Sequence, residues 1–131
     1  MALPNFESSK ILSKSDITKP ALSNEMARHM IPLMNGRHFL DLTVEDIWRQ
    51  QWPLRYYTRP NGNRICPVFT IGWYLYVKAK GVRVGDQLIF SGRQVAGADG
   101  ELEMRYKIRV TRPGPVTFNG EPVPLDVEYL A

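Results

Sequence analysis

The sequence predicts a mainly β domain, a small barrel or sandwich that carries two short helices. Three observations predict this fold class. Apolar and polar residues alternate in several short stretches, turn residues separate these stretches at short intervals, and only two stretches carry helix signals. A chain of 131 residues also fits a single domain with an ordinary hydrophobic core.

The first part of the chain contains two expected strands and one expected helix. Phe6–Leu12 has the composition of a first strand. A short helix is predicted over Asn24–His29, because Ser23 can cap its first turn and Pro32 follows its end. His38–Val44 alternates apolar and polar side chains with a period of two, which is typical of a strand.

A hairpin and a second helix are expected next. Trp52–Thr58 and Pro67–Thr70 are predicted to be the two strands of the hairpin, joined by a polar, cationic turn. Gly72–Lys80 is predicted to be helical, and Gly81 supplies the stop signal at its C-terminus. These elements place a positively charged loop at residues 59–64.

The last part of the chain predicts two more strands and a tail. Gln87–Ser91 is one strand, and Leu102–Thr111 is the clearest half-buried strand because its apolar residues alternate with charged ones. The Pro-rich tail contains Asn119-Gly120, a turn signal. We therefore divide the chain into a domain at 1–112 and an acidic extension at 113–131. The extension is either a hairpin or strap that packs on the barrel or, for its last few residues, a floppy terminus.

The charge distribution favours a polyanionic partner. The whole chain carries a formal charge of +4, but residues 1–112 hold all 17 basic and only 10 of the 13 acidic residues, which leaves that part at +7. No acidic residue occurs between Asp46 and Asp86. A basic body with an uncompensated basic segment is common among proteins that bind nucleic acids.

Other function classes find little support in the sequence. No apolar run approaches the length of a membrane span, and the N-terminus lacks the pattern of a signal peptide. The single Cys66 cannot form an internal disulfide, and His29 and His38 do not have the spacing of metal ligands. The neighbouring acids Asp41, Glu45 and Asp46 do not amount to an acid–base pair. We predict no enzyme activity, no cofactor, no metal and no membrane contact.

Six motifs, taken in order and spacing, resemble one known family. They span nearly everything from Phe6 to Arg112 and lie at Lys10–Ile17, Ala27–Pro32, Trp52–Tyr56, Phe69–Trp73, Val77–Val82 and Val84–Phe90. Together they are similar to the plant B3 DNA-binding domain of auxin-response and abscisic-acid-insensitive transcription factors. The resemblance implies a seven-stranded open β-barrel, or pseudobarrel, with two short α-helices. It also implies a nuclear protein whose partner is double-stranded DNA.

The resemblance implies two arms that grip the major groove, here Lys14–Asn24 and Tyr57–Arg64. Physical chemistry agrees, because cations on projecting loops release counterions from DNA, while Arg and Asn can make bidentate contacts with guanine and adenine. The first arm is shorter and the second longer than in many members of the family. The candidate DNA-contact residues are Lys14, Ser15, Thr18, Lys19, Asn24, Tyr57, Thr58, Arg59, Asn61, Asn63 and Arg64.

Several of these residues also have a structural interpretation. Lys14 and Lys19 can be ordinary solvated lysines, and Asn61 can form a tight turn with the following glycine instead of reading a base. Arg55 lies in a strand and can brace the second arm or pack on aromatic rings. The large aromatic residues fit a hydrophobic core better than a base-stacking platform.

The function predicted from the sequence is therefore sequence-specific binding of double-stranded DNA by a transcription factor. The alternative is a protein-interaction module on a barrel with weak or lost DNA affinity, whose C-terminal extension binds a protein partner. A further rival is the DNA effector domain of a restriction endonuclease, because some of these enzymes carry a similar barrel. No carboxylate–lysine core of a nuclease is evident in the chain. The oligomeric state is left open.

Overall fold

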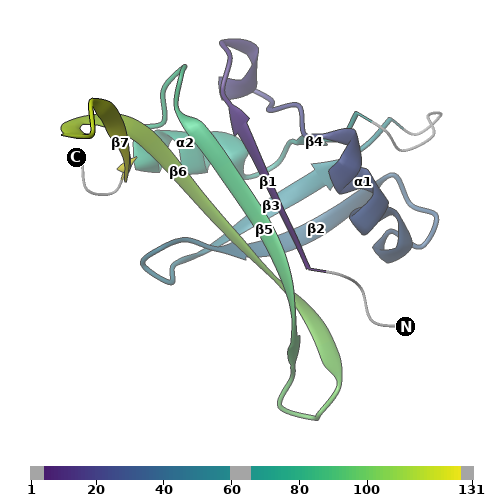
Figure 1. Ribbon diagram of the computed structural model, residues 1–131. Coiled ribbons are helices and arrows are strands. Elements are labelled where there is room, and N and C mark those ends of the chain that lie inside the picture. The colour runs from purple at the N-terminus through teal and green to yellow at the C-terminus, as the bar shows by residue number, and fades with distance from the viewer. Residues whose placement is uncertain (1–4, 60–65, 128–131) are drawn as a thin grey trace.

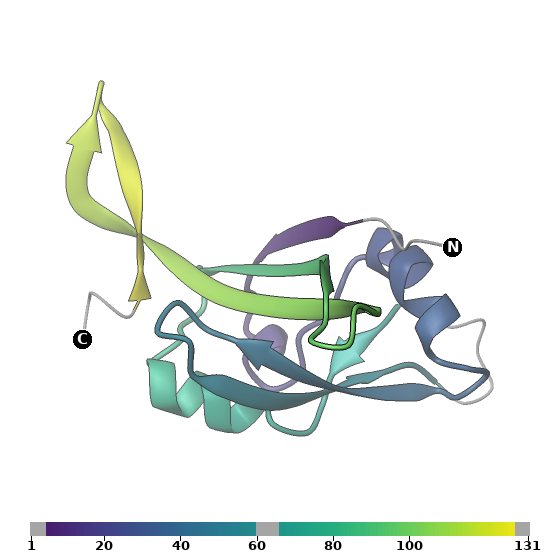
Figure 2. The ribbon, with the colours of Figure 1, turned by 90° about the horizontal axis from the view of Figure 1, so that it is seen from below.

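The strands of the protein form one curled sheet that makes an open barrel (Figures 1 and 2). The structure is a computed structural model that describes residues 5–59 and 66–127. Within these residues the sheet has seven strands, as predicted. They are β1 (Phe6–Ile11), β2 (Phe39–Glu45), β3 (Gln51–Tyr57), β4 (Val68–Phe69), β5 (Gln87–Ala96), β6 (Leu102–Phe118) and β7 (Glu121–Asp126).

The strand order explains why the barrel is open. The main path runs β1-β5-β6-β2-β3-β4, and β7 pairs with the outer part of β6. Neighbouring strands are antiparallel except for β2 and β6, which pair in parallel at Val44 and Glu45. The two edges of the path, β1 and β4, are not paired with each other. Segments between strands therefore have to cover the gap between these two edges.

Both predicted helices are confirmed to within one residue. Helix α1 (Asn24–Met30) is capped by Ser23, whose Oγ accepts a hydrogen bond from the Met26 N–H at 3.2 Å. Helix α2 (Trp73–Lys80) ends at Gly81, which has a φ of +67°. Short 3₁₀ turns, η1 (Ser15–Ile17) and η2 (Ile31–Leu33), flank α1 in the chain. In both views α1 and α2 lie at opposite ends of the barrel.

The hydrophobic core fills the inside of the curled sheet. Aromatic rings form its centre, where Phe69 packs edge-on against Phe90 with centroids 5.2 Å apart and Trp73 stacks on Tyr76 at 5.7 Å. Burying large rings in such offset and edge-on pairs contributes a large share of the stability of a small domain. The largest fully buried side chains are Trp73, Tyr56, Tyr76, Phe69 and Phe90.

Three strand predictions need correction. Strand β5 is longer than predicted because its hairpin with β6 continues beyond the barrel to the pair Ala96–Leu102 (Figure 1), and β6 is longer because it continues past Thr111 and pairs with β7. We expected the apolar residues of β6 to be half-buried along its whole length, yet Leu102 is 59% exposed. No layer lies beneath the end of the hairpin, so the alternation of apolar residues there does not lead to burial. Strand β4 is shorter than predicted, with only two residues.

Within the C-terminal extension, β6 and β7 form a hairpin, which is one of the forms that the sequence allowed. Asn119 and Gly120, with φ values of +52° and +82°, make the turn between β6 and β7. The base of the hairpin is fixed to the barrel, because Arg109 makes a two-pronged ion pair with Asp126 and Val127 belongs to the core. Its tip extends away from the barrel (Figure 2). The division of the chain at residue 112, which falls inside β6, stays a prediction.

Gly72 lets the start of α2 pack directly on the backbone of β3. Its φ of +92° is strained for any residue with a Cβ, and a Cβ at this position would overlap the carbonyl oxygen of Pro53. Gly81 also has a positive φ, but a Cβ there would meet open space. An alanine at Gly81 would therefore cost stability through its backbone conformation alone. An alanine at Gly72 would add the steric cost of the contact with β3.

We expect Gly72→Ala to destabilise the protein clearly more than Gly81→Ala. The Gly81 variant should lose about 1–2 kcal/mol from its left-handed conformation. The Gly72 variant should lose that amount and more, because helix and strand must also move apart. Urea unfolding of both variants measures the difference, and equal losses would contradict the direct contact between α2 and β3.

Candidate nucleic-acid interface

Asp16 organises the first arm, residues 14–24. Its carboxylate accepts hydrogen bonds from the backbone N–H and the hydroxyl of Ser13, both at 2.8 Å, and from the backbone N–H of Ala21 at 3.1 Å. Lys10 adds an ion pair at 3.0 Å and also donates to the Ala21 carbonyl at 2.7 Å. One buried side chain therefore fixes both the start and the return of the arm.

The charge state of Asp16 follows from these contacts. Burial by itself raises the pKa of the carboxyl group. The hydrogen bonds from Ser13, Lys10 and Ala21 together outweigh burial and hold the pKa below its ordinary value of 3.8. Asp16 is therefore ionised at neutral pH, and its negative charge is used inside the arm rather than presented to a ligand.

Trp73 fastens the first arm to the core. The indole is fully buried, and its Nε1–H donates to the carbonyl oxygens of Asp16 and Ile17, each at 3.0 Å. A buried indole N–H without a partner would cost about 1–3 kcal/mol, so these bonds are strongly favoured. Because Trp73 is the first residue of α2, the position of the arm depends on the position of that helix.

The end of the first arm lies beside residues 66–68, which follow the second arm (residues 57–64) in the chain. Ala21 forms an isolated antiparallel bridge with Val68, and the Leu22 N–H donates to the Pro67 carbonyl at 2.8 Å. The Cys66 N–H donates to the Asn24 Oδ1, also at 2.8 Å. These bonds cover the gap at the β4 edge of the barrel. The first arm is therefore joined to the residues that follow the second arm, and projection of both arms from the same side stays a prediction.

Six predicted contact residues are exposed to solvent, namely Lys14, Ser15, Thr18, Lys19, Arg59 and Asn24, the last of which is described below. The hydroxyl of Ser15 lies 3.2 Å from that of Ser13, so it also takes part in the local turn. Tyr57 is half-buried, and its ring packs edge-on against His38 with centroids 5.6 Å apart. Asn61, Asn63 and Arg64 lie outside the described residues.

Two other predicted residues have structural tasks. Thr58 is only 1% exposed, and its hydroxyl donates to the His38 carbonyl at 3.1 Å. The Oδ1 of Asn24 holds the Cys66 N–H, although a bidentate contact with adenine would require that oxygen. Both side chains therefore shape the second arm, and their use in base contacts stays a prediction.

Arg55 ties β3 to β2 through its side chain. Its guanidinium makes two hydrogen bonds to Asp41 on β2, at 2.7 and 3.1 Å, and lies over the Phe39 ring at 4.2 Å. The hydrogen bond from Arg55 also lowers the pKa of Asp41. Of the two interpretations that the sequence allowed, packing on an aromatic ring is confirmed, and bracing of the second arm stays a prediction. The core interpretation of Tyr56, Phe69 and Phe90 is also confirmed.

Comparison with solved structures identifies the architecture. The Arabidopsis FUS3–DNA complex aligns with a TM-score of 0.54 at 20% identity, covering 76% of this chain and 92% of that chain. The hypothetical Arabidopsis thaliana protein At1g16640.1 aligns with a TM-score of 0.53 at 14% identity, covering 84% and 94%. The chain has the B3 pseudobarrel fold. No protein-family model and no curated protein sequence matches it.

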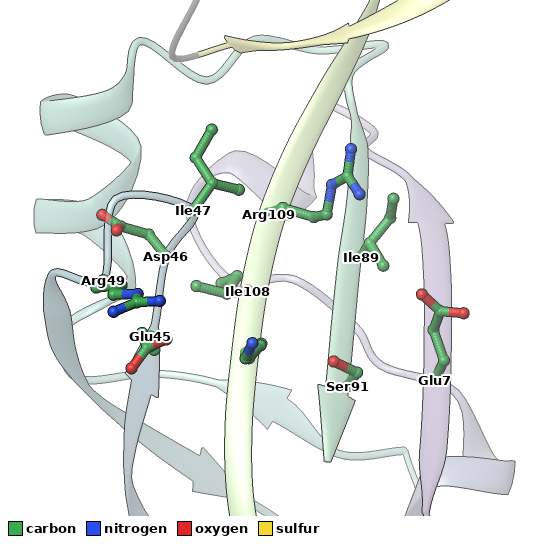
Figure 3. Close-up of a pocket in the computed structure, with 10 residues that line it drawn as sticks. Glu7, Glu45, Asp46, Ile47, Arg49, Ile89, Ser91, Ile108 and Arg109 are labelled. Atoms are coloured by element: carbon green, nitrogen blue, oxygen red, sulfur yellow. The ribbon is translucent and has the colours of Figure 1, made fainter. Parts of the chain in front are cut away.

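The outer face of this B3 pseudobarrel has a cleft of about 330 Å³ that contains acidic residues (Figure 3). Asp46 lies at one side of it, where its carboxylate accepts backbone hydrogen bonds from Trp48 and Gln50 at 2.8 and 2.9 Å. Lys80 approaches the same carboxylate at 2.7 Å, and these bonds outweigh burial and lower the pKa of Asp46. An acid held in its ionised form builds the β2–β3 turn and is poorly suited to donate a proton.

Two further searches covered the described residues. No group of three or more His, Cys, Asp or Glu side chains has an arrangement that could hold a metal ion. None of the helices has both the length and the apolar composition needed to cross a bilayer.

The sequence analysis missed the roles of Asp16 and Trp73. The pattern Ser13-x-x-Asp16 is a capping-box pattern and could have predicted the local turn. The contact between Trp73 and the first arm joins residues 57 positions apart, so no local pattern could have predicted it.

We expect Asp16→Asn to lose about 2–3 kcal/mol of stability at pH 7. The Asn amide cannot form the ion pair with Lys10, and its NH₂ group would face N–H and O–H groups that also donate. The wild-type contribution is present above the unfolded pKa of about 4 and is lost as the pH falls through the lower folded pKa. The stability of the variant should therefore fall less steeply below pH 4. Urea unfolding across pH 2–7 measures both effects.

The matched control is Asp99→Asn, which alters an exposed carboxylate in the β5–β6 turn. It should lose much less stability than Asp16→Asn. If both variants behaved alike at every pH, Asp16 would not organise the arm.

Proposed function

We propose that this domain binds double-stranded DNA in the major groove through its two arms, and that it acts in the nucleus as a sequence-specific transcription factor. The observation that carries the proposal is the joint between the first arm and the residues that follow the second arm. Ala21 pairs with Val68, and Asn24 holds Cys66, which supports a position of both arms on one side of the barrel. The likeness in fold to the FUS3–DNA complex, a protein solved with DNA, supports the proposal.

The exposed cations supply the affinity in this proposal. Lys14 and Lys19 on the first arm and Arg59 on the second are solvent-exposed, and each phosphate that they neutralise releases counterions. Asp16 and Trp73 hold the first arm in place before binding, which reduces the entropy lost when DNA binds. In this proposal the second arm recognises the DNA base sequence, through Arg59 and the predicted contacts Asn61, Asn63 and Arg64. No enzyme activity, cofactor or metal is part of the proposal.

A protein-interaction module is the second candidate function. It is favoured by the outward face of α2 and the turn before it, where Ile71, Tyr74 and Leu75 are 62%, 63% and 65% exposed. Three large apolar side chains at adjacent positions of one helical face are a feature of surfaces that contact proteins. Helix α2 itself lies at the other end of the barrel from α1 (Figure 1).

We expect Lys19→Ala combined with Arg59→Ala to weaken duplex binding and to reduce its salt dependence. Loss of two phosphate contacts should lower the slope of log K against log salt by about 2. Fluorescence anisotropy of a labelled duplex, measured over a series of salt concentrations, gives this slope.

The control pair, Lys78→Ala with Arg83→Ala, removes two exposed cations outside the arms and should leave the slope unchanged. Negligible duplex affinity of the wild type at low salt would contradict the DNA proposal and favour the protein-interaction module. Equal slopes for the two variant pairs would show that binding depends on overall charge rather than on the arms.

A further inference from the structure

A second group of cations lies on the outer face of the barrel, on the β5–β6 pair. In the antiparallel register Arg93 is directly opposite Arg105, and Ser91 is directly opposite Lys107. The alternate residues Phe90, Gly92 and Ile108 are buried and Tyr106 is half-buried, so these four side chains point outward. They occupy the four corners of a small rectangle, which we call the outer-face grid. Three corners are cationic and the fourth is a hydroxyl.

The grid borders a cleft of about 380 Å³. The start of β1 forms the opposite wall of this cleft, with Asn5, Phe6 and Glu7. Glu7 is the only carboxylate among the described residues that line it. Arg105 has a second acidic neighbour in Glu103 at 3.3 Å, but both side chains are more than half exposed, and such a pair is weak. Positive charge therefore exceeds negative charge at the cleft.

The fold gives the grid no structural use. Like charges directly opposite each other on neighbouring strands are destabilising, and Arg93 and Arg105 are such a pair. A bound anion would turn that repulsion into attraction. Arginine presents a planar fork of N–H donors that matches phosphate oxygens, lysine adds a point charge, and a serine hydroxyl donates one further hydrogen bond.

The neighbouring cleft in Figure 3 differs in its charges. Its Arg109 is already paired with Asp126 at 2.9 Å, and Glu7, Glu45 and Asp46 also line it. Acidic and basic groups are therefore balanced there, whereas Arg93 and Arg105 line only the cleft beside the grid.

We propose that the outer-face grid, Arg93, Arg105, Lys107 and Ser91, binds a phosphate group. A phosphate presents more acceptor oxygens than a carboxylate and arranges them tetrahedrally, so it suits several donors around one cleft. The phosphate belongs either to a nucleic-acid backbone or to a free phosphate compound. The grid residues lie on β5 and β6, and none of them belongs to either arm.

Pyrophosphate is the probe for this site. Titrated into the full-length chain and followed by two-dimensional amide NMR, it should shift the amides of residues 91–93 and 105–107 in a saturable manner. Sodium chloride at the same ionic strength should not. Arg93→Gln combined with Arg105→Gln should weaken pyrophosphate binding at least tenfold, while Lys78→Gln with Arg83→Gln should not change it. All four positions are exposed, and the spectrum itself reports whether each variant is folded.

Several results would overturn the proposal. Shifts that do not saturate, shifts centred on the arms, or equal binding by the two variant pairs would each show that the grid is no phosphate site. If the double variant failed to fold, Lys107→Gln would replace it. Unchanged pyrophosphate binding by that variant would likewise show that the grid is no phosphate site.

Duplex binding then distinguishes the two sources of phosphate. If the backbone of DNA is the ligand, the Arg93 and Arg105 variant should lower the salt slope by about 2. If the ligand is a free phosphate compound, the slope should stay unchanged while pyrophosphate binding is lost. The Lys19 and Arg59 variant should keep its pyrophosphate shifts, so failure of DNA binding by the arms would leave the grid proposal standing.

Discussion

The position of the first arm depends on one buried side chain, the indole of Trp73. Its ring belongs to the aromatic core, and its N–H donates to two consecutive carbonyls of the arm. Moving the arm would leave this donor unpaired in the interior, which is costly. Gly72, the residue before it, lets α2 approach the β3 backbone closely enough to fix the ring. The rigidity of the core is therefore transmitted to a loop on the surface.

Ion pairs formed on folding neutralise part of the positive charge that the sequence suggests. The segment between Asp46 and Asp86 contains no acidic residue, yet its cations Arg55 and Lys80 pair with Asp41 and Asp46. Arg112 likewise makes a two-pronged pair with Asp86. These pairs hold strands and helix together and leave less positive charge for a ligand. Exposed lysines and arginines remain on the arms and on the outer face of β5 and β6.

Local patterns predicted the elements well because their signals are local. Ser23 and Gly81 act on residues within one turn, and the alternation in β2 reflects a sheet with one buried face. The extent of β6 could not be predicted, because the alternation stops at Pro113 while pairing with β7 continues through a shift in register. No local sequence pattern predicts the bridge between Ala21 and Val68, because it depends on how distant parts of the chain meet at the edge of the sheet.

The same distinction separates the residues that hold the arms from those available to a ligand. Asp16, Trp73 and Thr58 are buried, and their polar groups are used within the protein. Substituting them should change the position of an arm, and hence every ligand contact together. Lys19 and Arg59 are exposed, so substituting them should change affinity with little effect on the fold. A fold built in this way can keep its scaffold while its arm sequences diverge, which is consistent with a shared fold at 14–20% identity.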